Sequence, residues 1–138
     1  MAVAVATLTL FDFPKGVDNT QRYQILRGTI NVGFGTYPPG GFTLNWGSLT
    51  NSGGGRVEGI PNSGSTVLPV EVDVQSMAAN PKGFVYIVDS AGNLRVFIAA
   101  NTASTTSGPL IEGVGPNANV PGDLVTDTIL FTAYFVRN

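Results

Sequence analysis

The sequence predicts an all-β fold, an antiparallel β-sandwich of the jelly-roll type, built as one domain from 138 residues. Short runs in which apolar and polar residues alternate are separated by turn-forming clusters, and 18 Gly and 9 Pro supply those turns. No window shows a helical apolar period long enough to predict a helix. About eight short strands at this spacing are typical of a sandwich or barrel, and a two-sheet jelly roll holds that many strands in one domain.

The first two strands are expected at residues 2–13 and 22–34, on either side of a turn at residues 14–19. Because the first cation is Lys15, the N-terminal run lacks the positive segment of a signal peptide, and we expect a strand there. Gly28 interrupts the second strand, and an isolated glycine at such a position predicts a bulge or bend.

The next run alternates Phe42, Leu44 and Trp46 with polar residues. Phe42 and Trp46 share one parity, so at least one of them is expected in the core. Residues 47–66 are almost all turn formers, and a loop of that length is usually functional or mobile.

The second half of the chain predicts a half-buried strand followed by a hairpin. The strand sets three valines against three polar residues: Val70, Val72 and Val74 against Glu71, Asp73 and Gln75. Residues 84–89 and 94–99 flank a turn that contains Gly92, which is a strong hairpin signal. The carboxylate of Asp89 is expected to bond amides of that turn.

Two more strands are expected toward the C-terminus, a short one at residues 110–111 and a long one at residues 128–137. The long run places four apolar residues on one face: Ile129, Phe131, Ala133 and Phe135. Thr128, Thr132 and Tyr134 are expected mostly on the other face.

The charge balance argues against two classes of partner. The chain carries 7 Lys+Arg and 9 Asp+Glu, a formal net charge of -2, with no basic run. A nucleic-acid binder needs a basic stripe, so we expect no direct nucleic-acid partner. No stretch reaches the ~18 apolar residues of a membrane-spanning helix, so we expect no membrane partner. A charged fraction of 12% suits a surface that is held against another protein.

The sequence contains no His and no Cys. This excludes disulfides, cysteine nucleophiles, Cys/His zinc sites and Ser-His catalytic pairs, and it fits a reducing compartment. The Gly33-Phe-Gly35 and Gly113-Val-Gly115 segments lack the third glycine of a dinucleotide fingerprint. We therefore expect no enzyme and no cofactor.

Two acidic pairs are candidates for chemical sites. Glu71 and Asp73 share one strand face, but their alternation with valines favours the solvated face of a strand over a general acid/base pair. Asp123 and Asp127 could supply oxygen ligands to calcium, but their spacing matches no EF-hand, and turn or strand-entry roles are favoured. We expect no metal site.

Aromatic residues offer a different kind of site. Four of them could form a sugar-stacking platform, although core or interface packing is favoured: Trp46, Tyr23, Tyr37 and Tyr134. Tyr37, beside Pro38 and Pro39, is expected to be the best exposed anchor for a protein partner because Tyr is enriched at binding hot spots.

Two parts of the chain carry a family resemblance. The first runs from Arg27 to Trp46 and reads RGTINVGFGTYPPGGFTLNW. The second is the hairpin at residues 84–97, FVYIVDSAGNLRVF, with the late run at 127–137, DTILFTAYFVR. Together they resemble the jelly-roll cement, or decoration, proteins of tailed-bacteriophage capsids.

The resemblance implies a virion structural protein on the outer surface of an icosahedral phage head, made in the host cytoplasm. Such a protein bridges neighbouring subunits of a major capsid protein of the HK97-type fold and associates with itself as a dimer or trimer. Two alternatives stay open, a carbohydrate- or receptor-binding β-sandwich module and a structural protein of the tail or head–tail connector.

A cement protein can add a strand to its partner edge to edge, and the terminal runs, residues 2–13 or 128–137, are expected to supply that edge. The candidate partner contacts are Tyr37, Pro38, Pro39, Arg56, Val3, Val5 and Phe135. Many small contacts of this kind, repeated by capsid symmetry, give high avidity even if each is weak.

Overall fold

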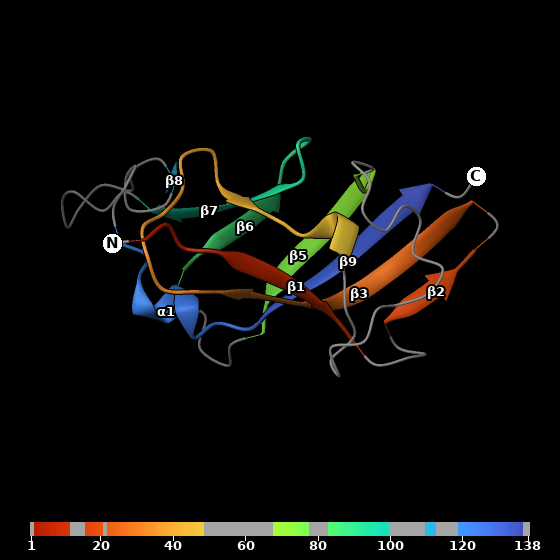
Figure 1. Cartoon of the computed structure of the whole chain (residues 1–138), viewed down its shortest axis with the longest axis horizontal. Coiled ribbons are helices and arrows are strands. Elements are labelled where there is room, and N and C mark those ends of the chain that lie inside the picture. The colour runs from red at the N-terminus through yellow and green to blue at the C-terminus, as the bar shows by residue number, and fades with distance from the viewer. Residues whose placement is uncertain are drawn as a thin grey trace.

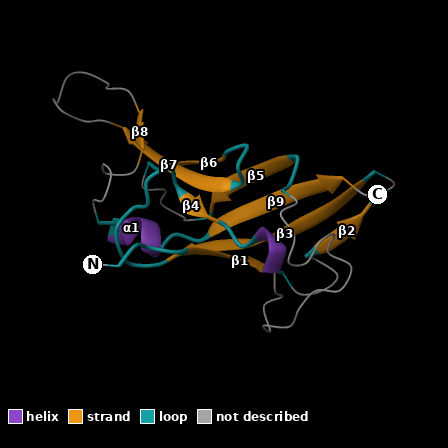
Figure 2. Cartoon of the chain, turned by 45° about the horizontal axis from the view of Figure 1, so that its top comes forward, coloured by secondary structure: helices purple, strands orange, loops and turns teal. Residues whose placement is uncertain are grey.

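The computed structural model describes residues 2–11, 16–20, 22–48, 68–77, 83–99, 110–112 and 119–136. These residues form two antiparallel β-sheets packed as a sandwich, which confirms the predicted all-β class (Figure 1, Figure 2). The elements are β1 (Ala6–Leu10), β2 (Val17–Asn19), β3 (Tyr23–Val32), β4 (Phe42–Thr43), the 3-10 turn η1 (Trp46–Ser48), β5 (Glu71–Ser76), β6 (Val85–Val88), β7 (Asn93–Ala99), β8 (Leu110–Glu112), α1 (Gly122–Val125) and β9 (Ile129–Val136).

The larger sheet has the order β1-β3-β9-β5, and β2 also pairs with β3. β1 and β2 share one edge of β3, because β1 pairs with Gly28 to Val32 and β2 pairs with Gln24 to Leu26. β9 lies between β3 and β5 and pairs with both. The C-terminal run is therefore a central strand of this sheet.

The smaller sheet has the order β4-β7-β6, and β8 also pairs with β7. β4 pairs with the start of β7 and β8 pairs with its end, both opposite the edge that β6 occupies. The predicted short strand at residues 110–111 is thus confirmed as β8. The jelly-roll connectivity of the sandwich stays a prediction.

Alternating apolar residues of both sheets fill the space between them. In β9 the predicted shared face is confirmed and lies in the core, since Ile129, Phe131, Ala133 and Phe135 are all buried. In β5 the half-buried face is also confirmed: Val72 and Val74 pack against the core, and Glu71, Asp73 and Gln75 are exposed. Val70 differs from the prediction and is exposed, because it precedes the paired part of the strand.

Trp46, the first residue of η1, is buried in the core. Its ring makes edge contacts with Phe131 and Phe135, at centroid distances of 5.8 Å and 5.9 Å. Its indole Nε1 donates a 2.9 Å hydrogen bond to the carbonyl of Gly92, in the turn between β6 and β7. Trp46 therefore connects the two sheets, and the expectation that Phe42 or Trp46 is in the core holds for both.

Gly28 does not form the bulge or bend that the sequence predicted. The register is continuous through it, with Leu10 opposite on β1 and Phe131 opposite on β9. A Cβ at this position would collide with the carbonyl oxygen of Thr9 and approach the Cα of Leu10 to 2.8 Å. The glycine is required by this close approach of two backbones.

The predicted hairpin is confirmed as β6 and β7. Gly92 has a φ of 79°, and Oδ1 of Asp89 accepts 3.0 Å hydrogen bonds from the amides of Ala91 and Asn93. Nε of Arg95 lies 2.7 Å from Oδ2 of the same carboxylate. Burial alone would raise the pKa of Asp89, but the bonds from Arg95 and the two amides outweigh it and lower the pKa.

Candidate functional site

Two predicted contact residues, Val3 and Val5, are exposed on the N-terminal segment that leads into β1. Their exposed fractions are 57% and 65%, whereas Ala4 and Ala6 between and after them are buried. The segment alternates as a strand does, so its small residues face the core and its valines face solvent.

A third apolar residue, Phe34, lies on the segment beside these valines and is 78% exposed. The amide of Gly33 donates a 2.8 Å bond to the carbonyl of Val5, and the amide of Ala4 donates a 2.9 Å bond to the carbonyl of Thr36. We call Val3, Val5 and Phe34 the N-terminal apolar patch. Large exposed apolar side chains on neighbouring backbone segments make this a candidate contact surface.

Sequence reasoning missed Phe34 because it extended the alternation of the second strand through that residue. β3 ends at Val32, so Phe34 no longer follows the strand's inward face. The signal was present in the sequence as the glycines on both sides, Gly33 and Gly35. Gly35 has a φ of 141°, and a Cβ there would lie 2.5 Å from the carbonyl oxygen of Ala2.

The prediction that Tyr37 is an exposed anchor is wrong. Tyr37 is only 3% exposed, and its ring packs edge-on against Phe42 at 5.2 Å. Its hydroxyl accepts a 3.2 Å hydrogen bond from the amide of Val96 on β7. Tyr37 therefore holds its loop to the smaller sheet, while Pro38 is half-buried and Pro39 is exposed at the same loop.

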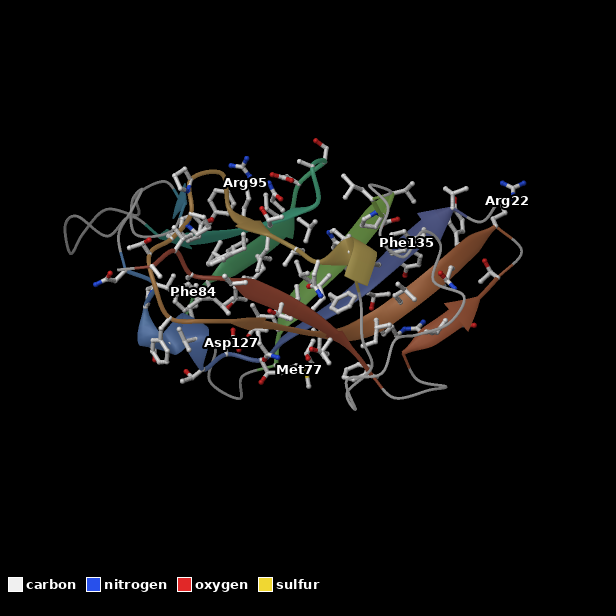
Figure 3. The ribbon with its side chains drawn as sticks, in the orientation of Figure 1. Arg22, Met77, Phe84, Arg95, Asp127 and Phe135 are labelled. Atoms are coloured by element: carbon white, nitrogen blue, oxygen red, sulfur yellow. The ribbon has the colours of Figure 1, made fainter. Side chains whose placement is uncertain are left out.

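Phe135 is also misplaced as a partner contact. It is 1% exposed and lies within the sandwich (Figure 3). Because β9 has β3 on one side and β5 on the other from Ile129 to Tyr134, this part of the C-terminal run has no free edge for strand addition. Arg56, the remaining candidate, and most of the loop at residues 47–66 lie outside the described residues.

The N-terminal run does form an edge strand, but a side chain occupies part of that edge. The amide of Leu8 donates a 2.7 Å bond to Oδ1 of Asn45, and Nδ2 of Asn45 donates a 3.4 Å bond to the carbonyl of Leu8. The Asn45 amide thus pairs with β1 as a neighbouring strand would. Blocking an edge in this way opposes pairing with another chain, so the valines before β1 are the better contact.

A buried polar cluster joins the two sheets where their edge strands β5 and β6 meet. Asp127, which is 8% exposed, accepts a 2.7 Å bond from the Ser76 hydroxyl on β5 and a 2.6 Å bond from the Tyr86 hydroxyl on β6. Figure 3 shows Asp127 near Met77, whose amide donates a 2.7 Å bond to the carbonyl of Thr128. Asp127 precedes β9, as its predicted strand-entry role requires.

Desolvation by burial, followed by the hydrogen bond to Asp127 and the charge of that carboxylate, raises the pKa of Tyr86 far above its ordinary value. The phenol is thus held in its neutral, donating form. The cluster is a structural connection in this geometry, since both carboxylate oxygens of Asp127 accept bonds from the two sheets.

The four aromatic residues weighed as a sugar platform do not lie together on the surface. Trp46 and Tyr37 are buried in the core. Tyr23 is exposed and Tyr134 half-buried on the outer face of the larger sheet. Trp46 is therefore not available to stack on a glycan.

Within the described part of the chain, no group of three or more acidic side chains gathers as a metal site does, and no helix is long and apolar enough to cross a membrane. Comparison of the chain with protein-family models, with curated proteins and with solved structures found no match. The N-terminal apolar patch is the candidate contact surface that the geometry supports best.

Proposed function

We propose that this chain is a virion structural protein, a cement or decoration protein that binds the outside of an icosahedral phage capsid and stabilises the head. Its partner in this proposal is a major capsid protein of the HK97-type fold, and it bridges neighbouring subunits of that protein as a dimer or trimer. The proposal rests on the resemblance of residues 27–46, 84–97 and 127–137 to this family and on one feature of the surface.

That feature is the N-terminal apolar patch. Val3, Val5 and Phe34 are each more than half exposed, although burial of such side chains favours folding or association by about 1.5–3 kcal/mol apiece. A patch of three residues gives a weak contact by itself. Repetition of the contact by capsid symmetry raises the total strength by avidity, as a cement requires.

A second property that suits a cement is resistance to shear between the two sheets. Trp46 connects β9 to the turn of the smaller sheet, and Asp127 connects β5 to β6. The two connections use different residues of the smaller sheet, Gly92 in the β6–β7 turn and Tyr86 on β6. A load applied through the N-terminal segment would therefore be shared by both sheets.

The direct experiment is co-sedimentation of the purified chain with heads of the virus that encodes it, from which the chain has been removed. The proposal predicts that the chain pellets with the heads and that Val5→Asp abolishes this. Val136→Asp is the matched control. Val136 is an exposed valine like Val5, with exposed fractions of 50% and 65%, but it lies at the end of β9, far from the N-terminus (Figure 1).

Recovery of the wild-type chain in the supernatant at every concentration would contradict the proposal. Equal loss of binding in both aspartate variants would contradict the assignment of the patch, because a general effect of the added charge would then explain the result.

A further inference from the structure

The outer face of the larger sheet contains a half-open hollow of about 220 Å³. Six of the residues that line it carry the argument: Phe11, Arg27, Asp73, Gln75, Leu130 and Thr132. The hollow is smaller than the ~300–1,000 Å³ of drug-sized pockets, so its occupant is a single small ring or group.

Strand register explains why these side chains gather. Asp73 on β5 is opposite Thr132 on β9, and Thr132 is opposite Arg27 on β3. The amide of Phe11 donates a 3.1 Å bond to the carbonyl of Arg27, which extends the row to the end of β1. Gln75 and Leu130 form the next row and are opposite each other. The backbones of Asp73 and Arg27 are therefore two strand spacings apart, about 10 Å.

The polar side chains around the hollow are not engaged with one another. Among the described residues, no side-chain hydrogen bond or ion pair involves Arg27, Asp73, Gln75 or Thr132. Asp73 and Gln75 are exposed, and Arg27 and Thr132 are half-buried. Their donors and acceptors are therefore available to a ligand without the loss of an internal bond.

We propose that this hollow is a binding site for a neutral saccharide unit. The carboxylate accepts, the guanidinium donates, and the amide and hydroxyl do both, so together they match a ligand that carries several hydroxyl groups. Leu130 and Phe11, which is 36% exposed, supply apolar surface for the face of a sugar ring. Apolar lining with a few convergent polar groups is the usual composition of a small-molecule site.

The charges select this class over ionic ligands. Asp73 repels a phosphate or carboxylate at one end of the hollow, and Arg27 repels a cation at the other end. A neutral polyol meets neither penalty, and its hydroxyl groups form charge-assisted bonds with both residues. A zwitterion is the competing occupant, and the test separates the two.

The experiment is a titration of the isotope-labelled full chain with glucose, galactose, mannose and N-acetylglucosamine, followed by amide NMR shifts. We expect saturable shifts for at least one sugar at residues 27, 73–75 and 130–132. The dissociation constant is expected on the order of 1 mM, as suits a small ligand in a shallow site. Glycine and acetate, added separately, should leave these amides unchanged.

Asp73→Ala is expected to weaken sugar binding by about tenfold or more, because a hydrogen bond to a charged group is lost. Glu71→Ala is the matched control, since Glu71 is an exposed carboxylate on the same strand that does not line this hollow. It should change the affinity by less than about twofold.

Three results would overturn the inference: no saturable shift with any of the four sugars, sugar shifts that Asp73→Ala leaves intact, or shifts with glycine or acetate in place of sugars. The sugar site is separate from the N-terminal apolar patch, because Phe11 follows β1 whereas Val5 precedes it. If the chain binds sugar but not heads, the sugar site stands and the proposed function is rejected. If it binds heads but no sugar, the proposed function stands and the sugar site is rejected.

Discussion

The hydroxyl of Tyr86 donates a 2.6 Å hydrogen bond to Oδ2 of Asp127, and this bond joins the smaller sheet to the segment that enters the central strand of the larger one. The Ser76 hydroxyl holds the other carboxylate oxygen from the edge strand β5. A single buried carboxylate thus joins β5 to β6, two strands that belong to different sheets and share no backbone ladder among the described residues.

Removing the phenolic hydroxyl should destabilise the fold. Tyr86→Phe leaves one oxygen of the buried Asp127 without its donor, and we expect a loss of about 1–3 kcal/mol in the free energy of unfolding. Urea denaturation measures this loss. Tyr134→Phe is the control, because Tyr134 is half-buried on the outer face of the sheet. Equal stabilities of the two variants would show that the Tyr86 bond contributes nothing.

Burial of the Tyr86 hydroxyl, together with its bond to Asp127, predicts a loss of stability at alkaline pH. The pKa of Tyr86 is raised from 10.0 in the folded chain, so the neutral phenol is favoured by folding. Its contribution is complete below about pH 10 and declines above it, by up to ~1.4 kcal/mol per pH unit. Unfolding free energies measured from about pH 9 to pH 12 should fall more steeply for the wild type than for Tyr86→Phe. Parallel curves would contradict the assignment.

Trp46 should be the most sensitive single position of the core. Trp46→Ala removes two aromatic contacts and the bond to Gly92, and we expect a loss of about 3–5 kcal/mol. Trp46→Phe keeps part of the ring packing and should lose less, so it gives a measurable transition even where the alanine variant does not fold. A thermal or urea transition of Trp46→Phe that matches the wild type would contradict the central role of the indole.

Asn45 should protect the edge of β1 from self-association. Asn45→Ala uncovers the amide and carbonyl of Leu8, and we expect a loss of about 1–2 kcal/mol in stability together with larger species in gel filtration. Asn31→Ala, which removes an exposed amide on β3, is the control. Identical elution of the two variants would show that this amide does not guard the edge.

Most of the sandwich could be predicted from local pattern, because period-two alternation reports directly which face of a strand is buried. The final run and the hairpin show this, since their buried residues and the bonds of Asp89 match the prediction. Gly28 shows the limit: its neighbour is Thr9 on another strand, and a clash between distant segments leaves no local signal.

The candidate site was harder to predict, because exposure depends on the arrangement of strands. Tyr37 sits beside two prolines, as an exposed loop residue would, but its ring packs against Phe42 and its hydroxyl accepts a bond from the amide of Val96 on β7. Phe135 belongs to a terminal run that lies in the middle of the sheet order. Val3 and Val5, which precede the paired part of an edge strand, could be identified by position in the chain, and Pro39 is exposed at its loop as predicted.

The most direct test of the cement proposal is a cryo-electron map of heads decorated with the wild-type chain. The proposal predicts β-sandwich density on the outer capsid surface, with Val3, Val5 and Phe34 packed against a capsid subunit. Heads without such density after saturation with the chain, or a bound sandwich whose N-terminal apolar patch faces solvent, would contradict it.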